Sequence, residues 1–98
     1  MKFDDILEIG VDNQERLYIS PLNERFPLIW RSATEVHWEP SKNTLYSPKP
    51  REWTYVDWYL HIIQVIKKEY ACQLLITGNT KWVNISLELK GEIINKRF

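Results

Sequence analysis

The stretch from Trp53 to Tyr70 constrains this chain most, because it is the segment with a sustained helical pattern. Its apolar residues recur three and four positions apart, so they fall on one broad side of a helix. That side holds Val56, Tyr59, Leu60, Ile63, Ile66 and Tyr70, widened by Tyr55, Trp58, Ile62 and Val65. The polar stripe is narrow and holds Thr54, Asp57, His61, Gln64 and Lys68. Such a helix must be covered by the rest of the chain on most of its sides.

Signals for the start of this helix agree with its apolar pattern. The Pro-rich approach at 47–50 is unfavourable for helical geometry, so the helix begins beyond it. Thr54 is placed to be the N-cap, and Asp57 stands where its carboxylate can complete a capping box. Trp53 and Trp58 occupy the two positions of a hydrophobic staple. The sequence therefore predicts a helix that begins directly after Thr54.

The rest of the chain reads as strands and turns. Before the helix we expect four strands in two hairpins, at 6–11, 16–20, 34–39 and 44–47. After the helix, residues 72–77 form a continuous apolar run, which is typical of a strand covered on both faces. We expect this strand to form a hairpin with a long alternating strand from Lys81 to Ile94, in which Gly91 marks a bulge. The apolar residues that share one face of that last strand are Val83, Ile85, Leu87, Leu89 and Ile93.

These elements predict an α+β fold. The expected architecture is a curved, mostly antiparallel sheet of about six strands packed around one helix, in the order β-β-β-β-α-β-β. A chain of 98 residues is shorter than those that usually split into two cores, so we expect a single domain over residues 1–98. Cys72 is the only cysteine, which rules out an internal disulfide.

Charge and hydropathy exclude several classes of partner. Thirteen basic and thirteen acidic residues give a formal charge of zero, without the basic run that binding to nucleic acid requires. No apolar run approaches the roughly 20 residues of a membrane-spanning helix. A lone cysteine and the lack of an apolar leader favour a reducing compartment, so we expect a cytoplasmic protein that binds neither nucleic acid nor membrane.

Candidate chemical residues are few. Asp57 and His61 lie one helical turn apart, as a general-base pair would, but such exposed pairs usually do no more than stabilise a helix. His37 and Glu39 share a strand face without a third ligand, so no metal site is expected. Cys72 opens an apolar strand, where cysteine behaves as a small buried hydrophobe. The pattern favours a non-enzymatic protein that uses no cofactor.

Five tryptophans supply the candidate binding residues. In the long last strand, Trp82 falls in a polar row with Asn84, on the side opposite the apolar face, and this position indicates either recognition or burial under a second layer. Trp38 shares its strand face with Val36, which is typical of core packing. Trp30 stands beside Arg31 in a segment without a clear period. The candidate binding residues are Trp82, Trp30, Trp38 and Asn84.

Two functions fit this surplus of aromatic residues. The first is a small non-enzymatic binding or accessory protein, such as an immunity-type partner, that presents an aromatic-rich interface to a protein partner. The second is a small-ligand binder with a pocket lined by tryptophan and tyrosine between the sheet and the helix. Hydrolase or isomerase chemistry on the two histidines is the third and weakest class.

The broad apolar side of the helix and the indole in a polar row predict self-association. We expect a homodimer, because two-fold symmetric contact is the commonest arrangement among oligomers. The expected contact is Trp82 with the strand from Lys81 to Glu88. The alternative is a monomer in which the irregular segment from Asn23 to Ser32 folds over the sheet and closes it.

Overall fold

Helix α1 (Tyr55–Tyr70) begins where the sequence predicts, in a computed structural model that describes residues 1–96. The Thr54 hydroxyl accepts a hydrogen bond from the backbone N–H of Asp57 at 3.2 Å, and the Asp57 carboxylate accepts one from the backbone N–H of Thr54 at 2.9 Å. This reciprocal capping box satisfies two N–H groups that the helix would otherwise leave unpaired. Ala71, in the left-handed conformation, ends the helix.

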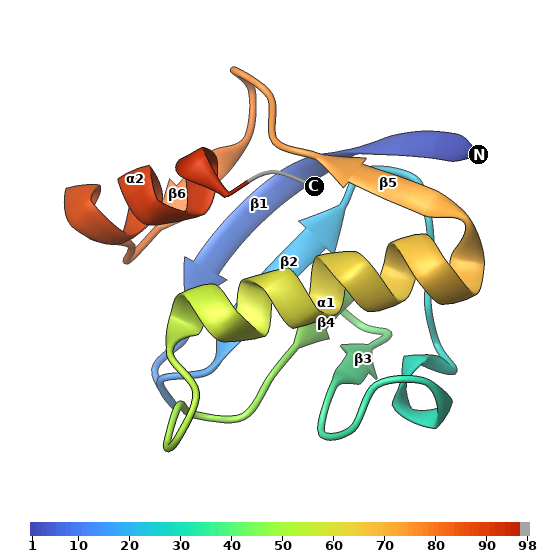
Figure 1. Cartoon of the computed structure of the whole chain (residues 1–98), viewed down its shortest axis with the longest axis horizontal. Helices are drawn as coiled ribbons and strands as arrows, with labels where there is room; N and C mark the ends of the chain where they lie inside the picture. Colours follow the sequence, from blue (N-terminus) through green and yellow to red (C-terminus); the bar gives the residue numbers. More distant parts are fainter. Residues whose placement is uncertain (97–98) are drawn as a thin grey trace.

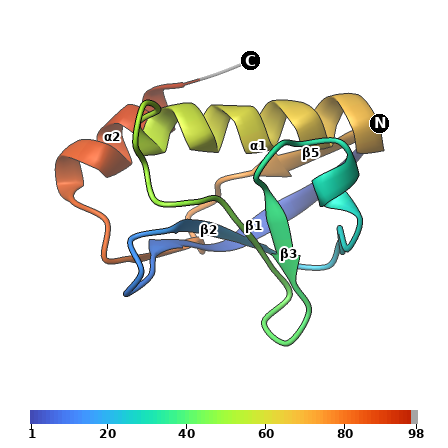
Figure 2. The ribbon, with the colours of Figure 1, turned by 90° about the horizontal axis from the view of Figure 1, so that it is seen from below.

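Six strands form one mixed sheet, with both helices on the same side of it (Figure 1 and Figure 2). Strand order is β3-β4-β2-β1-β5, with β6 also paired to β1. The predicted α+β class, the number of strands and their order around α1 are confirmed. The strands are β1 (Lys2–Val11), β2 (Leu17–Pro21), β3 (His37–Glu39), β4 (Thr44–Tyr46), β5 (Cys72–Leu75) and β6 (Lys81–Val83).

The prediction of one long strand from Lys81 to Ile94 is wrong. Only Lys81–Val83 is a strand, and Leu87–Asn95 forms helix α2. The Ser86 hydroxyl caps α2 by accepting the backbone N–H of Leu89 at 3.1 Å, and Gly91 lies inside the helix instead of at a bulge. Ile85, Leu89 and Ile93 recur every four residues and pack toward the core, whereas Leu87, which would share their face in a strand, is 87% exposed.

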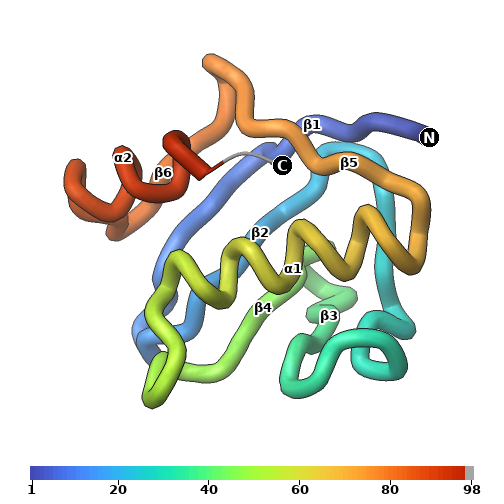
Figure 3. Tube along the Cα trace, in the orientation of Figure 1, coloured from blue at the N-terminus to red at the C-terminus, as the bar shows by residue number. Residues whose placement is uncertain are grey.

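The predicted hairpin between the last two strands is also wrong. Both β5 and β6 run parallel to β1 and pair with successive parts of it, Lys2–Asp5 with β5 and Glu8–Gly10 with β6. Figure 3 shows the loop that protrudes between them. Thr80 closes this loop, since its hydroxyl donates to the Ile6 carbonyl at 2.7 Å and accepts the Thr77 N–H at 2.9 Å. The two strands therefore act as one interrupted edge strand.

A bulge in β1 changes which side chains face the helices. Pairing with β2 shifts register between Ile6 and Glu8, and Leu7 points away from the core with 47% of its surface exposed. Regular alternation over the predicted strand 6–11 places Leu7 on the same face as Ile9 and Val11, and this expectation is wrong because those two residues are buried. Strand β5 is likewise covered on one face only, because Leu75 remains 38% exposed.

The core lies between α1 and the sheet and is filled by branched aliphatic and aromatic side chains. The irregular segment after β2 contributes Phe26 and Ile29, the latter in the 3₁₀ turn η1 (Ile29–Arg31). Within residues 1–96, no helix is long and apolar enough to cross a membrane. The largest fully buried side chains are Ile6, Ile9, Leu17, Ile19, Phe26, Ile29, Val36, Leu45, Ile62, Ile63, Ile66 and Ile93.

Candidate functional site

The face of the sheet turned away from the helices, here called the outer face, carries the first candidate site. Figure 2 shows α1 and α2 on one side of β1 and β2, with the β3–β4 turn projecting on the other. An open hollow of about 950 Å³ lies on this outer face. Residues from five strands and three connecting segments line it, among them Leu7, Glu8, Arg16, Tyr18, Leu22, Lys42, Tyr46 and Val83.

Tyr18 lies at the centre of the outer face, directly across the backbone of Gly10. The two residues are register partners in β2 and β1, and a Cβ atom at position 10 would overlap the Tyr18 ring. The phenol donates a hydrogen bond to the Glu8 carboxylate at 2.6 Å. Partial burial, this hydrogen bond and the charge of Glu8 together raise the pKa of Tyr18 well above its usual range. The side chain is therefore a neutral, fixed donor.

Arg16 links the turn after β1 to the same face. Its guanidinium lies 4.6 Å from the centre of the Tyr46 ring, and its Nε donates to Asp12 at 2.8 Å. Partial burial opposes ionisation of Asp12, but hydrogen bonds from Arg16 and from the backbone of Gln14 outweigh it and hold the pKa of Asp12 below its usual range. The arginine is thus oriented by a carboxylate and stacked on an aromatic ring.

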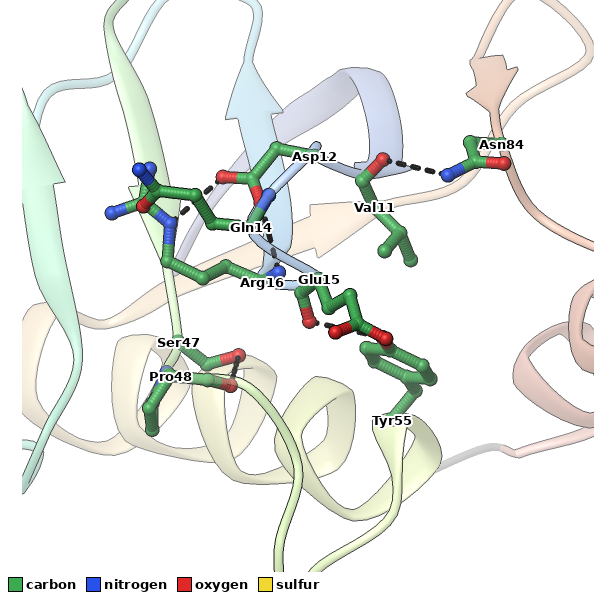
Figure 4. A network of polar contacts seen from close by, with 9 residues as sticks. All are labelled: Val11, Asp12, Gln14, Glu15, Arg16, Ser47, Pro48, Tyr55 and Asn84. Atoms are coloured by element: carbon green, nitrogen blue, oxygen red, sulfur yellow. Dashed lines mark hydrogen bonds and ion pairs between the residues drawn. The ribbon is translucent and has the colours of Figure 1, made fainter.

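Figure 4 shows how this turn is tied to the rest of the molecule. The Tyr55 hydroxyl, at the start of α1, donates to the Glu15 carbonyl at 2.9 Å. On the other side, Asn84 donates to the Val11 carbonyl at 3.2 Å. These contacts connect the rim of the hollow to the helix layer and to the segment after β6.

Replacing Gly10 by alanine is expected to displace the Tyr18 ring and break its hydrogen bond to Glu8. The pKa of Tyr18 should then fall toward the ordinary tyrosine value of about 10. An NMR titration of the tyrosine ring signals measures this change. Gly78→Ala is the matched control, because nothing lies within 4 Å of a Cβ atom there. An unchanged Tyr18 pKa in Gly10→Ala would refute the close approach.

A second candidate site is the aromatic corner, formed by Trp53, Trp58 and His61 at the start of α1. The ring centres of Trp53 and Trp58 are 4.7 Å apart, and the His61 ring lies 5.2 Å from Trp53 and 5.9 Å from Trp58. The first contact confirms the predicted hydrophobic staple. A hollow of about 590 Å³ opens above these rings.

The possible general-base pair of Asp57 and His61 has no support in the geometry. The Asp57 carboxylate accepts the Thr54 N–H in the capping box, and the His61 ring packs against the indoles of Trp53 and Trp58. Burial lowers the pKa of His61, whereas pairing with a carboxylate would raise it. Asp57 therefore stabilises the start of α1, and His61 packs against the staple.

Trp82 and Asn84 do not stand in the exposed polar row expected of them. Trp82 pairs with Ile9 of β1 on the core side of the sheet and packs partly buried against the core, with the Lys90 ammonium of α2 5.3 Å from its ring centre. A second layer thus covers this indole, which was the alternative to recognition. Asn84, in the left-handed conformation, is used to hold the end of β1.

The other two candidate tryptophans differ from each other. Trp38 packs edge-on against Phe26 at 6.0 Å and belongs to the border of the core. Trp30 is 55% exposed, and the Arg31 guanidinium lies 5.2 Å from its ring centre. The four candidate residues therefore do not converge on one site.

The remaining chemical candidates make different contacts. His37 stacks on Tyr46 at 5.4 Å, and Glu39 accepts a hydrogen bond from Ser41. Cys72 is buried, and burial raises the pKa of its thiol, as expected for a small core residue. In the part of the chain that the structure describes, no group of three or more acidic, histidine or cysteine side chains could hold a metal ion.

Sequence reasoning missed the outer face, although two signals pointed to it. Gly10 interrupts an apolar strand, and a glycine there often marks a close approach by another group. Tyr18 alternates with the buried Leu17 and Ile19, so it must face the other side of the sheet. The pairing of these two positions could not be known without the register.

Comparison with known proteins relates the chain to one family. A family model described as Integron Cassette Protein Hfx_Cass5 matches residues 4–80, from within β1 to just beyond β5. A solved structure from the mobile metagenome of the North West Arm Sewage Outfall, Integron Cassette Protein Hfx_Cass5, is 38% identical over 95% of this chain and 93% of that chain, with a TM-score of 0.50. No curated protein matches the chain.

Proposed function

This chain belongs to the family of the integron cassette protein Hfx_Cass5, and we propose that it is a small non-enzymatic binding protein whose outer face is a protein interface. The family description names no reaction and no ligand, so the proposal rests on the geometry of that face. The proposed setting is the cytoplasm, which suits a chain with one buried, unpaired thiol.

The observation that carries the proposal is the apolar surface on the outer face. The bulge in β1 and the alternation along the strands turn four large apolar side chains away from the helices, and Leu22, directly after β2, lines the same outer hollow. Exposed apolar residues that gather on one side of a small protein are typical of interaction sites. These residues are Phe3 at 67%, Leu7 at 47%, Leu22 at 45%, Val83 at 39% and Leu75 at 38% exposure.

The centre of the outer face has the composition of a binding hot spot. Tyr18, Tyr46 and Arg16 are held in place by the Gly10 backbone, by stacking and by the Asp12 carboxylate. Tyrosine and arginine contribute most to protein interfaces, in part because ordered side chains lose little entropy on binding. Ordered polar side chains surrounded by exposed apolar ones are typical of a surface that binds a protein partner.

The partner proposed for the outer face is a second copy of this chain. Three acidic and three basic side chains line the hollow, so the face carries both signs of charge in balance. A two-fold interface brings a surface against itself, which requires such self-complementary charge. This interface replaces the dimer contact through Trp82 that the sequence predicts, because α2 packs over that residue. The charged side chains are Glu8, Asp12, Glu39, Arg16, Arg25 and Lys42.

Replacing Leu7 by glutamate tests this interface. A buried, unpaired carboxylate on the outer face should weaken the dimer by at least about tenfold in Kd, which corresponds to about 1.4 kcal/mol. Sedimentation velocity over a concentration series measures the dissociation constant. The fold should survive, because Leu7 is half exposed and lies outside the core.

Leu87→Glu is the matched control. Leu87 is an equally apolar side chain on α2, 87% exposed and away from the outer face, so its replacement should leave the dissociation constant unchanged. Equal dissociation constants for the two variants would refute the assignment of the interface to the outer face.

A further inference from the structure

The aromatic corner carries an inference that goes beyond protein association. Trp53 and Trp58 form the staple of α1, which explains the contact between the two rings. The staple does not explain why Trp53 remains 43% exposed while Trp58 is 7% exposed. Trp53 is thus partly exposed where it lines a hollow of about 590 Å³, a volume within the range of small-ligand sites.

The rim of this hollow offers both donors and acceptors of hydrogen bonds. Glu35 and Glu52 supply carboxylates, and Lys49 and Arg51 supply cationic donors. Arg51 lies 3.4 Å from Glu35, and Lys49 is paired with Glu15 at 2.6 Å. These pairs are exposed and contribute little to stability, so their groups remain available to a ligand.

Charge in the hollow selects for a neutral ligand. The two acidic and two basic side chains of the rim balance each other. Burial lowers the pKa of His61, which keeps its imidazole neutral at pH 7. An anion or a cation would therefore find no net attraction, whereas a neutral molecule with many hydroxyl groups can donate to the carboxylates and accept from the cationic side chains.

Backbone conformation at the rim fixes the position of Glu35. Glu35 has a φ angle of 64°, in the left-handed region that residues other than glycine, asparagine and aspartate rarely adopt. Positive φ angles also occur at Glu15, Asn43, Ala71 and Asn84, and at Glu35 the surrounding structure holds the residue in place. The Glu35 carboxylate therefore lies on the rim of the hollow that Trp53, Trp58 and His61 also line.

We propose that the aromatic corner is a binding site for a neutral pyranose sugar, which stacks an apolar ring face on Trp53 and bonds its hydroxyl groups to Glu35 and Arg51. The site is separate from the outer face, so either proposal can fail without the other. A single sugar ring on one indole is expected to bind with a Kd of about 1 mM, which corresponds to about −4.1 kcal/mol.

The test follows the indole and imidazole NMR signals during titration with four probes, the methyl glycosides of glucose, galactose, mannose and N-acetylglucosamine. At least one of them should shift the Trp53 and His61 signals with a millimolar Kd and leave the Trp30 signal in place. Tetramethylammonium, a cation that stacks on aromatic rings, should cause no shift. A response to this cation alone, or no response to any of the four sugars, would overturn the proposal.

Two variants separate binding from folding. Trp53→Ala should abolish the shift of His61, but it also removes half of the staple and lowers stability. Glu35→Gln keeps the size of the side chain, so the fold should stay intact. The Kd for the sugar should rise at least threefold. Glu88→Gln, on the exposed side of α2, is the matched control and should bind as the unaltered protein does. Equal sugar affinity for the two glutamine variants would contradict the site.

Discussion

Replacing Ile63 by alanine is expected to lower the free energy of unfolding by about 2 to 5 kcal/mol. Ile63 is 1% exposed and lies in the core between α1 and the sheet. Truncation removes apolar contacts and leaves a cavity, because the close-packed surroundings relax only in part. Chemical denaturation, with the slope of the transition compared between variants, measures the loss.

Gln64→Ala is the matched control for this prediction. Gln64 is the next residue of α1 and is exposed on the polar stripe, so its truncation should change stability by less than about 0.5 kcal/mol. Equal midpoints for the two variants would mean that the register of α1 is incorrect.

Replacing Asp4 by alanine is expected to cost about 2 to 4 kcal/mol of stability. Asp4 is 5% exposed, and its carboxylate accepts the backbone N–H groups of Asn23 at 3.0 Å and Glu24 at 2.8 Å. The Asn23 side-chain amide donates to the same carboxylate at 3.2 Å. Alanine would leave two backbone donors without partners and release the segment that leads to Phe26.

Asp5→Ala provides the comparison for Asp4→Ala. Asp5 is the neighbouring residue of β1, but its side chain is exposed on the outer face. The same chemical change there should cost less than about 0.5 kcal/mol in thermal or chemical unfolding. A loss at Asp5 as large as that at Asp4 would contradict the assigned hydrogen bonds.

Local signals were sufficient to predict α1. Thr54, Asp57 and the tryptophan staple act within a few residues of one another, and the apolar side of the helix follows from its own spacing. Four of the six strands were placed within two or three residues of their observed ends, because turns and alternation are also local. The α+β class followed from the order of these elements.

The segment after β6 was misassigned because two periods compete in it. Val83, Ile85, Leu87 and Leu89 alternate as in a strand, whereas Ile85, Leu89 and Ile93 repeat every four residues as in a helix. Tertiary packing decides between them, since the helix buries Ile93 completely and leaves only Leu87 and Ile94 largely exposed. Ser86 was the local signal for a helix start.

Pairing between distant strands could not be predicted from the sequence. The parallel contacts of β5 and β6 with β1 join residues more than sixty positions apart, and the bulge in β1 depends on its register with β2. The parallel pairing and the bulge together determine which side chains lie on the outer face. Three of the four candidate site residues are tryptophans, and the strand register together with α2 decides that Trp82 is covered.

The mass of the protein in solution tests the proposed interface most directly. Light scattering coupled to size exclusion, at tens of micromolar, is expected to show a particle of two chains, each of 11.8 kDa. Leu7→Glu should shift this particle toward one chain, and Leu87→Glu should leave it as a dimer. A mass of 11.8 kDa for the unaltered protein across the concentration series would contradict the proposal that its outer face binds a second copy.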